Sequence, residues 1–179
     1  NYIKKGPEHV PYKLNCSFFY RNFDIIKVMK LTLATSIKYG NYKHLKHDAN
    51  LVFKWIKFYW NDFKEYFEFD DDVEFHVRPV RGNTHGWYRN KKKKIEIDPR
   101  YSPRKVLDTI AHELVHAEQY KQGRLAWDAD ARQSVWNGEL HKRGTTYKLY
   151  RNRPWEIEAR ERAAQFVEDM RGKYHDMPW

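Results

Sequence analysis

The chain has 179 residues, of which 41% are hydrophobic and 17% are aromatic. This is enough apolar material to bury a core without disulfides, and it argues against a disordered chain. We therefore expect one domain over residues 1–179, with a helical part at about 22–67 and a zinc-site core at about 73–170. The single cysteine, Cys16, excludes an intramolecular disulfide and favours a reducing compartment.

The formal charge of +10 favours acidic partners, such as nucleic acid, an anionic membrane surface or an acidic protein. Part of this charge lies in two short runs, Lys91–Lys94 and Lys142–Arg143, which are typical of solvated hairpins and loops. No stretch approaches the roughly 20 apolar residues that cross a bilayer, and residues 1–7 lack the apolar centre of a signal peptide. These features predict a cytoplasmic protein without a membrane partner.

Four segments carry apolar residues at helical spacing. They are residues 22–39, 42–67, 103–123 and 154–170. The third begins with Pro103 after Ser102, a combination that is typical of a helix start. Residues 124–153, between the last two helices, are predicted to be rich in loops.

Strands are predicted between the second and third helices, because apolar and polar residues alternate there. The expected strands are 73–77, 86–88 and 92–98, with a turn at 89–91. The expected fold class is therefore α+β, with N-terminal helices, a small, mainly antiparallel sheet and two further helices.

One predicted helix contains the pattern H-E-x-x-H at His112, Glu113 and His116. Histidines four residues apart lie on one helical face, so both imidazoles can reach one tetrahedral zinc ion while Glu113 faces a bound water. Zinc brings the pKa of that water towards about 7, and a carboxylate can then take its proton. We predict Zn²⁺ held by the two histidines, with Glu113 as the catalytic base. The alternative is two partly exposed histidines without a metal.

A catalytic zinc site needs a third protein ligand. The metzincin extension of the motif requires a glycine and a histidine where this chain has Gln119 and Gln122, so that subclass is excluded. Asp128, Asp130 and His141 lie in the segment that follows and are candidates.

Glu156 is the preferred third ligand. It shares one face of the last helix with Ala159, Ala163, Val167 and Met170. A carboxylate on such a buried stripe needs a partner, and the two alanines would let this helix approach the zinc helix closely. The alternative is that Glu156 only complements the dipole of the first helical turn.

The run Glu156-Ile157-Glu158-Ala159 resembles the E-x-x-A element of gluzincins, in which the first glutamate completes a zinc site begun by H-E-x-x-H. Gluzincins usually carry an aspartate after this alanine, where the chain has Arg160. This departure leaves open which residue supports the histidine ligands.

Residues 86–88, 95–98 and 107–113 also resemble the strand-strand-helix entry of SprT-like metalloproteases, a kind of small zincin frequent in bacteriophage genomes. This resemblance covers about 73–170 and implies a minimal zincin fold with an edge strand above the zinc. A peptide could add to that edge, which would be 84–90 or 94–98.

Peptide hydrolysis also needs a hydrogen-bond donor to the transition state. Tyr147, Tyr150 and His141 could supply it from the segment before the last helix, and we name Tyr147 and His141 as the catalytic candidates.

The predicted function is a zinc-dependent metallopeptidase that acts on a protein or peptide substrate. SprT-like proteases include enzymes that act on DNA-bound proteins, so the resemblance and the basic charge make nucleic acid a candidate partner. One alternative is a non-catalytic nucleic-acid-binding or virion structural protein, although such a protein has no need of Glu113. A second alternative is a peptidoglycan hydrolase or another amidase with the same zinc chemistry.

Overall fold

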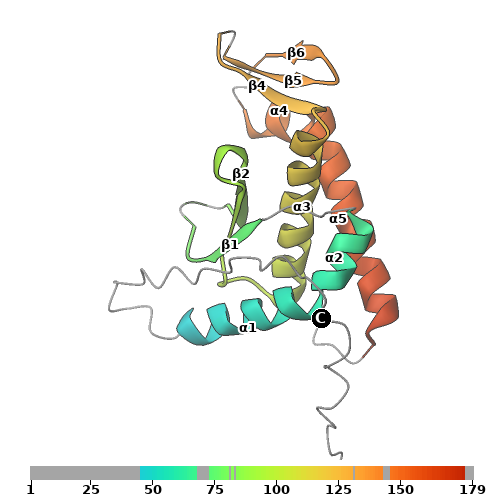
Figure 1. Ribbon diagram of the computed structural model, residues 1–179. Helices are drawn as coiled ribbons and strands as arrows, with labels where there is room; N and C mark the ends of the chain where they lie inside the picture. Colours follow the sequence, from blue (N-terminus) through green and yellow to red (C-terminus); the bar gives the residue numbers. More distant parts are fainter. Residues whose placement is uncertain are drawn as a thin grey trace, which may run out of the picture.

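The fold centres on two long helices, α3 (Pro103–Lys121) and α5 (Pro154–Lys173) (Figure 1). The computed structural model describes residues 45–67, 73–80, 82, 84–130, 132–142 and 146–175. Arg104 at the start of α3 pairs with Glu168 near the end of α5, so the two helices lie antiparallel. None of the described helices combines the length and apolarity that crossing a bilayer requires.

Both helices begin where the sequence predicts, with a proline in the first turn. Ser102 caps α3 by accepting a hydrogen bond from the backbone N–H of Lys105. Ala159 and Ala163 of α5 are fully buried, and their small size lets α5 lie close to α3. This close approach brings the first turn of α5 to the face of α3 that carries the histidines.

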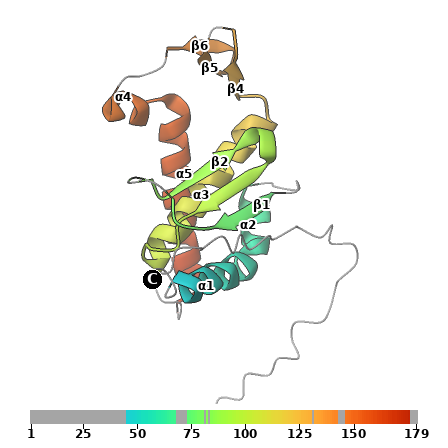
Figure 2. The ribbon, with the colours of Figure 1, turned by 90° about the vertical axis from the view of Figure 1, so that its left-hand side faces the viewer.

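A three-stranded sheet packs against α3 (Figure 2). Its strands are β1 (Glu74–Val77), β2 (Gly86–Arg89) and β3 (Lys94–Ile97), and the short 3-10 helix η2 (Asn90–Lys92) joins the last two. The central strand is β3, whose Ile95 and Ile97 are fully buried. The edge strand that packs against α3 is therefore β2. Of the two segments expected to form this edge, 84–90 contains β2, whereas 94–98 contains the central strand β3.

The helix predicted over 42–67 is two helices, α1 (Leu45–Phe58) and α2 (Trp60–Tyr66). The chain bends at Tyr59, and the bend lets both pieces reach the far end of α5. The ring of Phe58, at the end of α1, lies 4.9 Å from that of Tyr174, and the ring of Phe63 on α2 lies 4.9 Å from that of Phe166. The helix expected at 22–39 lies outside the described residues.

The stretch predicted as loops, 124–153, instead forms a second three-stranded sheet and a short helix. These are β4 (Leu125–Asp128), β5 (Gln133–Trp136), β6 (Glu139–His141) and α4 (Tyr147–Arg151). Asn137 and Gly138, both with positive φ, form the two-residue hairpin between β5 and β6. The α+β class is confirmed. Within the part of the chain that the structure describes, three of the four strand pairs are antiparallel, and the exception lies in the predicted sheet, where β1 runs parallel to β3.

Candidate metal centre

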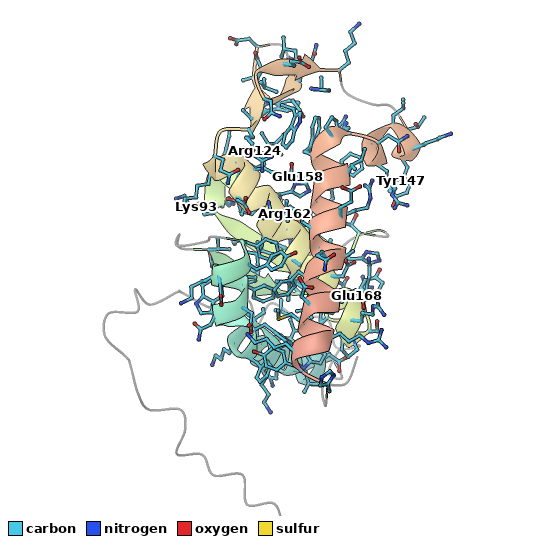
Figure 3. The ribbon with its side chains drawn as sticks, turned by 90° about the vertical axis from the view of Figure 1, so that its right-hand side faces the viewer. Lys93, Arg124, Tyr147, Glu158, Arg162 and Glu168 are labelled. Atoms are coloured by element: carbon cyan, nitrogen blue, oxygen red, sulfur yellow. The ribbon has the colours of Figure 1, made fainter. Side chains whose placement is uncertain are left out.

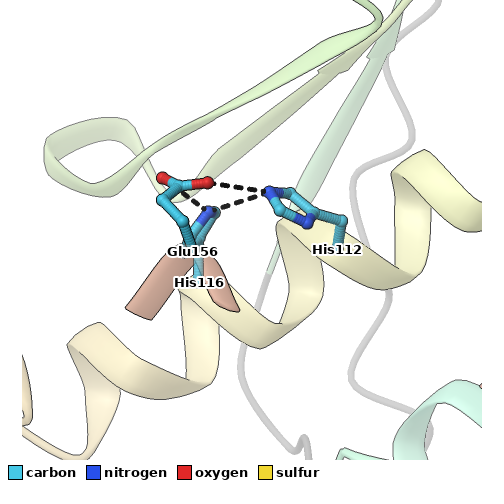
Figure 4. Close-up of side chains that lie close together, drawn as sticks. All are labelled: His112, His116 and Glu156. Atoms are coloured by element: carbon cyan, nitrogen blue, oxygen red, sulfur yellow. Dashed lines mark hydrogen bonds and ion pairs between the residues drawn. The ribbon is translucent and has the colours of Figure 1, made fainter. Parts of the chain in front are cut away.

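His112, His116 and Glu156 converge on one point between α3 and α5 (Figure 4). The Nε2 atoms of the two histidines lie 3.1 Å apart, because residues one turn apart on α3 face the same way. Each of these atoms lies 3.5 Å from a different carboxylate oxygen of Glu156. Among the described residues, this is the one group of histidine, cysteine and acidic side chains with ligand atoms so close together.

The three side chains are buried on all but one side. Glu156 exposes 4% of its surface and His116 exposes 8%, whereas the side chain of His112 exposes 20%. The group is therefore reached from the side of His112. Two imidazole nitrogens and one carboxylate oxygen form a donor set typical of catalytic zinc, which keeps a fourth position for water or substrate.

Gln119 fixes the orientation of His116. Its side-chain nitrogen donates to the carbonyl of Trp155 at 3.1 Å, so its side-chain oxygen must be the atom 2.9 Å from Nδ1 of His116. That oxygen can only accept, so Nδ1 carries the proton and Nε2 is the nitrogen available to a metal. Gln119 is fully buried and thereby joins α3 to the residue before Glu156.

The charges of the group favour a cation at its centre. Burial acts to lower the pKa of His116, but a hydrogen bond with Glu156 and the charges of Glu113 and Glu156 outweigh it and raise the pKa to about 9. Burial likewise acts to raise the pKa of Glu156, but hydrogen bonds from His112 and His116 hold it well below its usual range. Two carboxylates thus stabilise a positive charge here, and a metal ion can replace the proton that supplies it.

Glu113 lies beside this group and is held by the sheet. Its Oε2 accepts a hydrogen bond of 2.7 Å from the backbone N–H of Tyr88 on β2. Burial raises the pKa of Glu113, although the neighbouring imidazoles act to lower it. One carboxylate oxygen is thus oriented by the edge strand, and Oε1 is the oxygen left to act on a water molecule.

Gly86 explains how β2 comes close enough to hold Glu113. A Cβ atom at this position would lie 2.6 Å from Cγ2 of Thr109 and 2.9 Å from the carbonyl oxygen of Glu96. Two residues of a strand span about 6.8 Å, which is close to the roughly 6 Å that four residues of a helix span. Because Gly86 lies against Thr109, Tyr88, two residues further along β2, lies against Glu113, four residues further along α3. Only glycine allows this contact without displacing the strand or the helix.

Tyr150 is the tyrosine that the structure brings to the converging group of His112, His116 and Glu156. Burial raises its pKa, and the negative charge of Glu156, a hydrogen bond with Glu156 and the charge of Glu113 raise it further. Although Tyr150 exposes 36% of its surface, its hydroxyl is thus turned inward to the carboxylates. The guanidinium of Arg153 lies 5.4 Å from the ring centre and holds it from the other side.

Neither Tyr147 nor His141 makes a described contact with His112, His116 or Glu156. Tyr147 exposes 74% of its surface, and its ring lies 5.8 Å from the guanidinium of Arg151. The ring of His141 packs edge-on against Trp155 at 5.3 Å, and its buried Nε2 has no hydrogen-bond partner among the described residues. The sequence could not separate Tyr147 from Tyr150, because both lie on the same short helix.

The remaining predicted candidates have local roles. Asp128 accepts a hydrogen bond from the backbone N–H of Asp130, and neither carboxylate belongs to the converging group. Arg160, which stands where gluzincins usually carry an aspartate, donates to the carbonyl of Arg151 at 2.7 Å and so holds α4 against α5. Gln119, one turn after His116, is the residue whose side chain supports the imidazole of His116.

No family model matches the chain, and neither a curated protein nor a solved structure matches it. The interpretation of the site therefore depends on the geometry of its own residues.

Proposed function

We propose that the protein is a zinc-dependent metallopeptidase, with His112, His116 and Glu156 as the metal ligands and Glu113 as the general base. The observation that carries this proposal is the convergence of the two Nε2 atoms and the carboxylate of Glu156, which come from helices that are far apart in sequence. A structural metal site would not need a further carboxylate, whereas Glu113 is buried beside the group and oriented by Tyr88.

A zinc ion held by His112, His116 and Glu156 would supply Lewis-acid polarisation of a carbonyl group and a lowered pKa for a water molecule. Glu113 would take a proton from the attacking water on Oε1, because Tyr88 holds its other oxygen. The same carboxyl group then delivers the proton to the leaving amine. Tyr150 would donate a hydrogen bond from its hydroxyl to the oxygen on which negative charge develops, since this hydroxyl lies within hydrogen-bonding reach of Glu156.

The substrate is proposed to lie along β2. This strand is an edge of the sheet, and an extended peptide can add to such an edge through main-chain hydrogen bonds. Because β2 also holds Glu113, a peptide on this edge would have its carbonyl groups close to the general base. The exposed side of His112 leaves room for the scissile bond.

The first test is zinc content by elemental analysis of the wild type, Glu113→Gln and Glu156→Ala, combined with cleavage of casein. We expect one zinc per chain in the wild type, zinc without cleavage in Glu113→Gln, and weakened zinc binding in Glu156→Ala. Glu161→Ala is the matched control, because Glu161 is exposed on the same helix. A metal-replete wild type without zinc would refute the proposal and favour the nucleic-acid-binding alternative.

A further inference from the structure

The short helix α4 exposes apolar side chains beside the metal centre. None of its five residues is buried, and Tyr147, Leu149 and Tyr150 expose 74%, 54% and 36% of their surface. Isolated helices of this length are unstable in water, and most helices in proteins are stabilised by burying an apolar face. Burial therefore does not account for the order of α4 or for the exposed apolar residues that it carries.

Polar contacts hold α4 in place instead. The hydroxyl of Thr146 caps its start by accepting a hydrogen bond from the backbone N–H of Leu149, and Arg160 of α5 donates to the carbonyl of Arg151 at its end. Arg153 packs against the ring of Tyr150. The helix is thus fixed at both ends and in the middle, with the side chains of Tyr147 and Leu149 turned to solvent.

The position of α4 places this surface at the active site. Figures 1 and 2 both show α4 beside the start of α5, whose first turn carries Glu156. Tyr150 contacts that glutamate, while Tyr147 and Leu149 lie within the same five-residue helix. A ligand that covers Tyr147 and Leu149 would therefore pass close to the metal group.

The charge of α4 restricts the ligand. Lys148 and Arg151 are exposed, and the helix contains no acidic residue. Acidic side chains would find cations beside an apolar surface here, whereas basic side chains would be repelled. Leu149 offers no aromatic face for a nucleobase, and Arg151 already covers one face of Tyr147, so the surface suits a polypeptide better than a single-stranded nucleic acid.

We propose that α4 is a substrate-binding element that selects extended polypeptide segments carrying acidic and large apolar side chains close to the scissile bond. This inference rests on the proposed peptidase function. Tyr147 and Leu149 contact the apolar side chains of the substrate, and Lys148 and Arg151 contact its acidic ones. The surface thus defines the substrate class of a site whose ligands alone do not discriminate between sequences.

Binding to Glu113→Gln separates recognition from cleavage. Two dye-labelled peptides of equal length share the same Phe and Leu residues, and one carries Glu where the other carries Lys. We expect fluorescence anisotropy to give a dissociation constant on the order of ten-fold lower for the Glu peptide, as two exposed ion pairs can supply. Adding Lys148→Glu together with Arg151→Glu, the α4 reversal, is expected to reverse this preference. Adding Leu149→Ser instead is expected to weaken the binding of both peptides.

The matched control is Lys54→Glu with Lys57→Glu, which changes the net charge equally on exposed positions of α1. A preference that the α4 reversal leaves intact, or that the α1 control removes equally, would overturn the inference. The inference would also be overturned if the α4 reversal changed the binding of an oligothymidine probe but not that of the two peptides.

Cleavage assays with the zinc-loaded wild type distinguish a failure of the α4 inference from a failure of the proposed peptidase function. Cleavage of both peptides at equal rates, unaffected by the α4 reversal, would refute only the role of α4. Cleavage of neither peptide nor of casein would refute the peptidase itself.

Discussion

The side-chain oxygen of Gln119 lies 2.9 Å from Nδ1 of His116, and the same amide group donates to the carbonyl of Trp155. One buried side chain thus sets the orientation of a histidine on α3 and the position of the residue before Glu156 on α5. Partners of this kind fix the tautomer and ring orientation of a metal-binding histidine. Gln119 therefore couples the two helices that supply the proposed metal ligands.

Gln119→Leu is expected to lower zinc affinity about 10- to 100-fold, because Nδ1 of His116 loses its acceptor and the carbonyl of Trp155 loses its donor. Leucine has a similar volume, so the packing between the helices is retained. Competition with a chromophoric chelator measures the affinity. Gln122→Leu, at an exposed position at the end of the same helix, is the control. Equal losses in both variants would contradict the assigned role of Gln119.

The elements that hold His112, His116 and Glu156 could be predicted from the sequence because their signals are local. The spacing of His112 and His116 fixes their common face, and the prolines at 103 and 154 mark where α3 and α5 begin. Glu156 was predicted from a buried stripe on the last helix, and the structure places its carboxylate at both imidazoles. The interpretation of these three residues as zinc ligands remains a prediction.

The second sheet was missed although one signal for it was present. Asn137-Gly138 is a strong two-residue hairpin signal, but the flanking strands are short and only half-buried, so their alternation is weak. The contact of Gln119 with Trp155 and the inward turn of Tyr150 could not be predicted, because each depends on how two helices pack. No periodicity along one segment contains that information.

Tyr150→Phe is expected to lower kcat about 100- to 1000-fold, since the ring is retained while the proposed transition-state donor is lost. Zinc content and KM are expected to change much less. Tyr147→Phe provides the comparison within α4, and Tyr66→Phe on α2 controls for the loss of a hydroxyl elsewhere. Steady-state kinetics with the Glu-containing peptide measure these changes. A larger loss of kcat in Tyr147→Phe than in Tyr150→Phe would assign the donor to Tyr147.

Gly86→Ala is expected to lower kcat about 10- to 100-fold, because the added Cβ meets Thr109 and the carbonyl of Glu96 and so moves Tyr88 away from Glu113. Zinc content is expected to persist, since the three proposed ligands lie on α3 and α5 and not on β2. Adding Thr109→Ser removes the methyl group at 2.6 Å and should restore part of the rate.

Gly172→Ala is the matched control for this substitution. A Cβ at position 172 has no neighbour within 4 Å, so alanine in this helix should stabilise the protein by roughly 0.5–1 kcal/mol without changing kcat. Normal kcat in Gly86→Ala would show that the hydrogen bond from Tyr88 does not orient the base.

Glu158→Gln tests the ion pairs that join the ends of α3 and α5 (Figure 3). Arg124 makes two hydrogen bonds with Glu158, at 2.7 and 2.8 Å, and these bonds lower the pKa of the carboxyl group against the effect of burial. A lowered pKa means that the stabilisation is complete above the unfolded value of about 4.3 and is lost as the pH falls through the folded value. Glu158→Gln should therefore reduce the free energy of unfolding by about 1 kcal/mol at pH 7, and this difference should vanish in acid. Urea unfolding from pH 7 to pH 3 measures it, with Glu161→Gln as the exposed control, and a difference independent of pH would rule out the ion pair as its source.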